Sequence, residues 1–79
     1  MALMEKLTDV RALIDLWPTR AWMARKVGAN GAAVQKWHTN NRIPAVWHQS
    51  VIAAAKAEGF EGVTAEWMVA VHDRARLQA

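Results

Sequence analysis

The sequence predicts an all-α fold, a compact bundle of about five short helices. Apolar residues recur at spacings of three and four along most of the 79-residue chain, and this spacing places them on one face of a helix. No stretch shows the strict apolar–polar alternation of a strand, and no internal repeat or low-complexity tract is present. A chain of this length has room for one hydrophobic core, so we expect residues 1–79 to form a single domain.

The first helix is predicted by an apolar stripe that stops before a proline. The helix can begin near Leu3, or it can begin at Thr8 as the N-cap, with Asp9 as an acid that the helix dipole favours. In both cases we expect it to end at Trp17, because Pro18 disfavours helical geometry in the residue before it. The stripe consists of Leu3, Leu7, Val10, Ile14 and Trp17.

Residues 20–40 predict two short helices joined by a tight turn, which is a helix-turn-helix pattern. Thr19 is a suitable N-cap for the first helix, over about residues 20–27, and Gly28 can end it because a left-handed backbone is cheap for glycine. Asn30 can cap the second helix, which should reach the asparagine pair at positions 40 and 41. Small or apolar residues line the facing sides of the two helices: Met23, Ala24, Val27, Val34 and Trp37.

Two further helices are predicted in the second half of the chain. Ile43 is expected to anchor a loop in the core, and Pro44 is placed as the first residue of a helix over about residues 45–58, where its missing amide costs nothing. After a short connector, Thr64 can cap a last helix over about residues 65–77. The apolar face of the first of these helices carries Trp47, Val51, Ala54 and Ala55, and Phe60 and Val63 of the connector are expected to pack inward. The apolar stripe of the last helix consists of Trp67, Met68 and Val71.

Positive charge is concentrated in the middle of the chain. The net charge is +3, and all seven acidic residues lie outside residues 16–57. That segment has six lysines and arginines and no acid, hence +6, against −1 before it and −2 after it. Because the segment contains the helix-turn-helix pattern, we expect a surface suited to a polyanion. The six cations are Arg20, Arg25, Lys26, Lys36, Arg42 and Lys56.

The pattern resembles the helix-turn-helix of the Cro and lambda-repressor-like regulators. Ala24, Gly28, Val34 and Trp37 stand at the small, glycine, aliphatic and apolar positions of that motif. The Asn-Arg-Ile-Pro sequence at residues 41–44 is similar to the loop of a phage-associated subgroup, sometimes called carph-isopro, in which an Ile-Pro pair follows the recognition helix. The segments Ile-Asp-Leu-Trp-Pro, which ends at position 18, and Gly-Val-Thr, which ends at position 64, also fit that subgroup, so the resemblance covers roughly residues 8–70.

The resemblance implies a small phage or prophage-type transcriptional regulator that binds double-stranded DNA, as a homodimer on a two-fold operator. The helix over about residues 31–40 would enter the major groove while the preceding helix crosses the backbone. Gln35 can pair bidentately with adenine, Lys36 can donate to guanine, and Ala32 can touch a thymine methyl. Asn30 and Thr39 can serve either bases or phosphates. Phosphate contacts are expected from Arg20, Arg25, Lys26, His38, Arg42 and His48.

The apolar stripes predict where the tryptophans lie. Trp17, Trp37, Trp47 and Trp67 are expected in the core, since each falls on such a stripe. Trp22 lies beside the apolar arc of its helix and is expected to be partly exposed or to contact a partner. The sequence does not determine the dimer surface. Our hypothesis for it is the strip of Trp67, Met68 and Val71 on the last helix, together with the N-terminal stripe.

No catalytic, metal or cofactor site and no small-molecule substrate is predicted. Ser50 has no obvious acid partner, and the histidines are ten and twenty-four residues apart, not the three or four of helical metal pairs. Without cysteine there is no disulfide framework or thiolate zinc site. The chain has neither an apolar run of the ~20 residues that span a bilayer nor a signal peptide. We therefore expect no membrane partner and a cytoplasmic location: the bacterial cytoplasm or nucleoid, or the host cytoplasm for a phage-encoded chain.

One alternative function is a protein-interaction module, such as an antirepressor or adaptor, that keeps the fold without reading DNA. Gly31 and Ala32 favour it slightly, because relatives often carry polar base-reading side chains at these positions. The charge of +6 on residues 16–57 argues against it.

Overall fold

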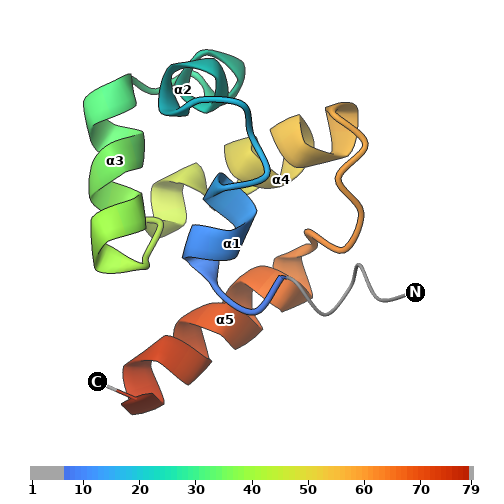
Figure 1. Ribbon diagram of the computed structural model, residues 1–79. Helices are drawn as coiled ribbons and strands as arrows, with labels where there is room; N and C mark the ends of the chain where they lie inside the picture. Colours follow the sequence, from blue (N-terminus) through green and yellow to red (C-terminus); the bar gives the residue numbers. More distant parts are fainter. Residues whose placement is uncertain (1–6, 79) are drawn as a thin grey trace.

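All regular secondary structure is helical in the part of the chain that the structure describes. In the computed structural model this part is residues 7–78, with side chains up to Arg74, and no strand occurs in it. The elements are α1 (Val10–Ile14), α2 (Arg20–Val27), α3 (Gly31–Asn40), the 3₁₀ turn η2 (Ala45–Trp47), α4 (His48–Ala57) and α5 (Ala65–Gln78) (Figure 1). The predicted all-α architecture of about five short helices is thereby confirmed.

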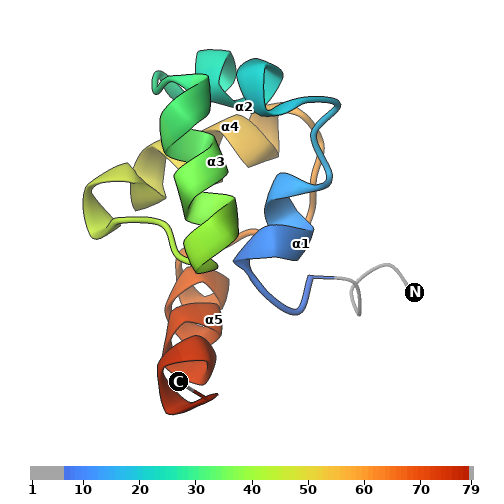
Figure 2. The ribbon, with the colours of Figure 1, turned by 60° about the vertical axis from the view of Figure 1, so that its left-hand side comes forward.

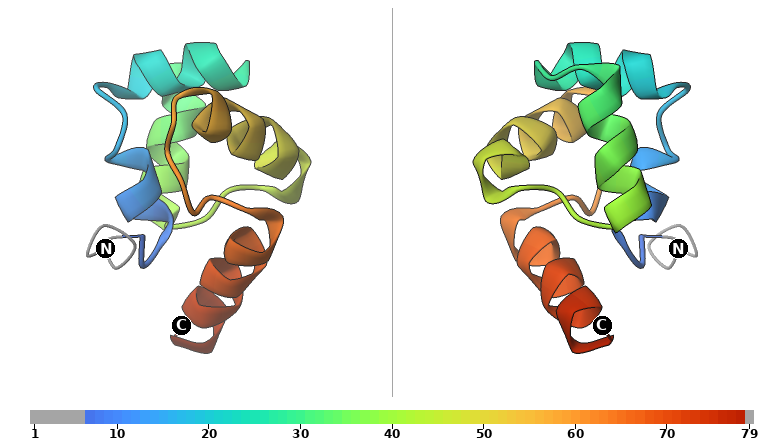
Figure 3. Two further views of the ribbon diagram at one scale, coloured as in Figure 1. Left: turned by 90° about the vertical axis from the view of Figure 1, so that its right-hand side faces the viewer. Right: turned by 90° about the vertical axis from the view of Figure 1, so that its left-hand side faces the viewer.

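The helices pack so that α3 lies on the outside of the bundle with one long face uncovered. Figure 2 shows α3 in front, with α2 across one of its ends and α1 beside the other. Helix α4 lies behind them, and α5 continues away from the other helices toward the C-terminus, as the two opposite views in Figure 3 show.

The core takes side chains from every helix and from the loops. All of the residues buried there are apolar, and most are the residues predicted from the helical stripes. Among them Ala24 is 3% exposed, so its small side chain allows α2 to approach its neighbours closely. The buried set is Val10, Leu13, Ile14, Trp17, Met23, Ala24, Val27, Val34, Trp37, Ile43, Val51, Ala54, Ala55, Val63, Met68 and Val71.

Helix α1 begins and ends at other residues than the sequence predicted. Its N-cap is Asp9, whose Oδ1 accepts from the Ala12 amide at 2.9 Å, and not Thr8. The alternative start near Leu3 lies outside the described residues. The predicted end at Trp17 is wrong, because the helix stops at Ile14. The amides of Leu16 and Trp17 bond three residues back, and this tighter turn still buries Trp17.

Helices α2 and α3 have the predicted bounds and caps. The Thr19 hydroxyl accepts from the Trp22 amide at 3.0 Å, and Asn30 Oδ1 accepts from the Ala33 amide at 2.8 Å. Gly28 has φ +92°, so the turn between the helices uses the left-handed conformation expected of it. At the end of α3, Asn41 is also left-handed, with φ +54°. Local capping chemistry therefore explains both helices and the turn that joins them.

The helix predicted over residues 45–58 is interrupted at its start. Pro44 has the extended backbone angle ψ 143° and precedes the 3₁₀ turn, so it is not the first residue of α4, which begins at His48. One cause is Ile43: its side chain is buried, and its carbonyl accepts from His48 Nε2 at 2.6 Å. This bond joins the side chain of the first residue of α4 to the loop that precedes the helix.

Four of the five tryptophans pack in or against the core, as predicted. Trp17 and Trp37 are buried, and Trp47 and Trp67 are half-buried against the core. Trp67 also donates from Nε1 to the Leu7 carbonyl at 2.9 Å. Trp22 is 40% exposed, which agrees with its predicted partial exposure.

The strip on α5 does not form a free dimer surface. Met68 is 1% exposed and Val71 is 2% exposed, because both pack into the core of the same chain. The N-terminal stripe is likewise used internally, since Val10 and Ile14 are buried. The predicted dimer surface is therefore wrong: apolar periodicity identified the buried side of each helix but not what would cover it.

Two histidines hold the peptide groups of Ile43. Its amide donates to His72 Nε2 at 2.9 Å, and its carbonyl accepts from His48. His72 Nδ1 in turn donates to the Met68 carbonyl at 2.7 Å. Because an amide can only donate, Nε2 of His72 must be the acceptor and its proton must sit on Nδ1.

Replacing His72 with phenylalanine is expected to lower the free energy of unfolding by about 1–3 kcal/mol, because the Ile43 amide loses its acceptor. His72→Gln is the matched control, since a glutamine oxygen can stand near the position of Nε2 and accept the same bond. Urea unfolding of the three proteins measures the difference. Equal losses in the two variants would show that the hydrogen bond is not the cause.

Candidate nucleic-acid interface

The uncovered face of α3 carries four of the five predicted base-reading residues. Val34 and Trp37 are buried on the opposite face of the helix, and this fixes its rotation about its own axis. Asn30 is at the start of the helix, where its Oδ1 is used to cap α3. The exposed residues on this face, here called the α3 strip, are Ala32, Gln35, Lys36 and Thr39.

The first turn of α3 is narrow because its side chains are small. Gly31 has no left-handed backbone, and a Cβ added to it would meet nothing within 4 Å. The fold therefore does not require glycine at this position. Together with Ala32, it leaves room for another molecule to approach the helix backbone closely.

Four of the six predicted cations are exposed and have no ion pair among the described side chains: Arg25, Lys36, Arg42 and Lys56. Lys26 is partly engaged, since its Nζ lies 3.9 Å from a Glu58 carboxylate oxygen and 5.7 Å from the centre of the Trp22 ring. These side chains supply exposed positive charge on α2, on α3, in the loop that follows α3 and on α4.

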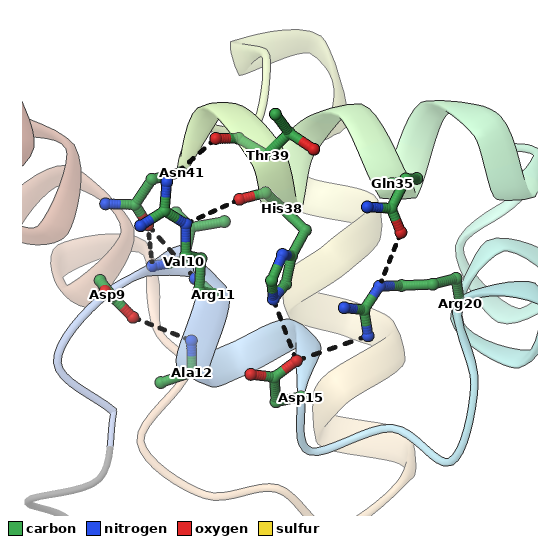
Figure 4. Close-up of polar contacts among 10 residues, drawn as sticks. All are labelled: Asp9, Val10, Arg11, Ala12, Asp15, Arg20, Gln35, His38, Thr39 and Asn41. Carbon is green, nitrogen blue, oxygen red and sulfur yellow. Dashed lines mark hydrogen bonds and ion pairs between the residues drawn. The ribbon is translucent and has the colours of Figure 1, made fainter.

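Two predicted contacts, Arg20 and His38, meet at one carboxylate beside the α3 strip. Asp15 Oδ1 lies 3.4 Å from Arg20 Nη1 and 3.1 Å from His38 Nε2. Arg20 Nε also donates to Gln35 Oε1 at 3.3 Å, so the chain of contacts reaches the strip (Figure 4). Helix α1 thus contributes an acid to a surface that was expected to be purely basic.

The charge of residues 16–57 is partly compensated in space although it is uncompensated along the chain. Asp15 and Glu58 lie immediately outside the segment and fold back onto Arg20 and Lys26. Pairs between exposed side chains contribute little stability, about 0–1 kcal/mol each. Their main effect is to reduce the positive charge that remains available to bind a polyanion.

Helices α1 and α3 cap each other's ends. Asn41 Oδ1 accepts from the amides of Val10 at 3.0 Å and Arg11 at 3.2 Å, at the start of α1. Arg11 donates from Nε to the His38 carbonyl at 2.9 Å and from Nη2 to the Thr39 carbonyl at 3.0 Å, at the end of α3 (Figure 4). These bonds satisfy backbone groups that both helix ends leave open and fix α3 relative to α1.

Arg11 and Asp15 were not predicted to belong to this surface. They are exposed polar positions on the first helix, and nothing in their local pattern distinguishes them from other solvated side chains. Both contact His38, which lies 27 residues after Arg11 and 23 residues after Asp15 in the chain. Only the packing of α1 on α3 brings them together.

His48 is separate from the α3 strip in its interactions. It is half-buried, its Nε2 is bonded to the Ile43 carbonyl, and its ring centre lies 4.8 Å from that of His72 on α5. We therefore do not include it in the phosphate-contacting set. Its proximity to Ile43 gives it a role in holding the loop before α4.

Residues 7–78 contain no group of three or more histidine, cysteine or acidic side chains placed to hold a metal ion. In the same range, no helix combines the length and the apolar character required to cross a membrane. Comparison of the chain with protein-family models, with curated proteins and with solved structures gave no match.

Proposed function

We propose that this protein is a sequence-specific regulator of transcription that binds double-stranded DNA through a helix-turn-helix formed by α2 and α3. The proposal rests above all on α3: its apolar side is anchored in the core, and its other side exposes only small, polar and basic residues. A major groove about 12 Å wide admits such a helix. The proposal also includes the Cro and lambda-repressor-like relationship, binding as a homodimer and action in the cytoplasm.

The roles proposed for the side chains follow from their exposure and contacts. The α3 strip would face base edges, with Gly31 and Ala32 allowing its first turn to come close. Arg25 and Arg42 would bind phosphates, because they are exposed and free of ion pairs with the described side chains. Phosphate contacts determine position and register on the duplex but do not read sequence.

Replacing Gln35 with alanine is expected to weaken binding to the preferred site by about 1–3 kcal/mol and to relax one base position. Arg25→Ala is the matched comparison on α2. It should weaken binding to every sequence and reduce the slope of log K against log salt by about one unit. Fluorescence anisotropy with preferred and random duplexes at two salt concentrations measures both effects. Equal loss on the two DNAs for Gln35→Ala would remove it as a base reader.

The preferred site itself would come from selection out of a pool of random duplexes. A dimeric regulator should recover a palindrome with half-sites about 10 bp apart, bound less tightly as salt rises. Salt-sensitive binding without enrichment of any sequence would contradict sequence-specific reading. Absence of binding at low salt would overturn the proposal in favour of a protein-interaction module.

A further inference from the structure

We propose that Arg20, held by Asp15, makes Gln35 a reader of guanine rather than adenine. This inference rests on the proposed function, since it specifies which base the α3 strip selects. It differs from the expectation that Gln35 pairs bidentately with adenine. The argument depends on which atom of the Gln35 amide faces Arg20.

The contact with Arg20 determines how the Gln35 amide is turned. A guanidinium has five N–H donors and no acceptor, so the amide atom that bonds to Arg20 Nε must be the oxygen. The amide nitrogen of Gln35 takes no part in the bond to Arg20, as Figure 4 shows. The side chain therefore presents its N–H donors on its free side.

Arg20 is in turn positioned by Asp15. The guanidinium is partly covered, with its side chain 33% exposed, and its Nη1 lies 3.4 Å from Asp15 Oδ1. Asp15 is the C-cap of α1, a helix whose other end is bonded to Asn41 at the end of α3. The packing of α1 on α3 thus places the backbone of Asp15, and Arg20 links its exposed carboxylate to Gln35. Both are positioning residues for Gln35.

The chemistry of this arrangement favours a base with acceptors only. Bidentate pairing with adenine requires Oε1 to accept from N6 and Nε2 to donate to N7. Here Oε1 is directed at Arg20, and the guanidinium places a positive charge where the N6 amino group would have to approach. Guanine offers two neighbouring acceptors, N7 and O6, to the Gln35 amide hydrogens.

The test is selection from random duplexes with the wild-type protein and four single variants, each first shown to fold by circular dichroism. Gln35→Ala identifies the base position that depends on Gln35, and the wild-type protein is expected to prefer guanine there. In Arg20→Ala, the ratio of guanine to adenine at that position should fall by about tenfold or more, because the freed amide can pair with adenine. Asp15→Asn should shift the ratio in the same direction by a smaller factor.

Arg25→Ala is the control, because it removes a cation from the same helix without touching Gln35. It should weaken binding and leave the base preference unchanged. A wild-type preference for adenine, or a preference that Arg20→Ala does not change, would overturn this inference while sequence-specific DNA binding stands. If Gln35→Ala relaxes no position, Gln35 is not a reader and the inference is also wrong. If no sequence is enriched by the wild-type protein, the proposed function fails first.

Discussion

Replacing Trp37 with alanine is expected to lower the free energy of unfolding by about 3–5 kcal/mol, the usual cost of deleting a buried aromatic side chain. Trp37 is 4% exposed, and its ring centre lies 5.7 Å from that of Trp47. At roughly 0.05–0.15 kcal/mol per residue, a domain of this length has a total stability of only about 4–12 kcal/mol. The substitution therefore removes a large share of what holds the fold together.

Urea unfolding followed by far-ultraviolet circular dichroism measures this loss without depending on tryptophan fluorescence. Lys36→Ala is the control, since Lys36 is the preceding residue of α3 and is exposed. Its effect on stability should be within about 0.5 kcal/mol. A similar stability for both variants would contradict the packing of α3 through Trp37. The same pair separates the two sides of α3, because Lys36→Ala is expected to affect DNA binding and Trp37→Ala folding.

Replacing Asn41 with alanine is expected to cost about 2–3 kcal/mol, from two separate causes. Alanine must adopt the left-handed backbone of this position, with φ +54°, which costs about 1–2 kcal/mol. The amides of Val10 and Arg11 also lose their shared acceptor, at a cost of about 1 kcal/mol for a helix cap. The second cause acts on α1, although the substitution lies at the end of α3.

Asn41→Gly separates these causes, because glycine adopts the left-handed backbone freely and lacks only the amide. It should lose about 1 kcal/mol, the value of the cap alone. Urea unfolding of both variants gives the two terms by difference. Equal losses would show that backbone strain contributes nothing, and no loss in Asn41→Gly would show that capping of α1 by Asn41 is unimportant.

The mutual capping of α1 and α3 also bears on the proposed function. Arg11 and Asn41 fix the C-terminal end of α3, and Val34 and Trp37 hold its inner face. The α3 strip is therefore carried by an element restrained at its side and at its end. Such restraint lowers the ordering cost of binding, because the side chains need not assemble a surface when the ligand arrives.

The sequence alone determined the elements whose signals are local. The bounds of α2 and α3, their caps Thr19 and Asn30, and the left-handed turn at Gly28 were all predicted, because each depends on residues no more than four positions apart. The buried faces of the helices were predicted for the same reason, since helical periodicity relates neighbours at three and four residues.

The tertiary structure decided everything that depends on distant partners. The early end of α1 and the extended backbone at Pro44 follow from how the elements pack, and no local pattern encodes that packing. For the same reason, only the structure shows that Met68 and Val71 are covered by their own chain. The same holds for the contacts on the surface. Arg20 joins Asp15, five residues before it in the chain, to Gln35, fifteen residues after it. Composition could predict that this region is basic. Which cation is neutralised, and which way the Gln35 amide faces, depends on contacts made only when α1, α2 and α3 come together.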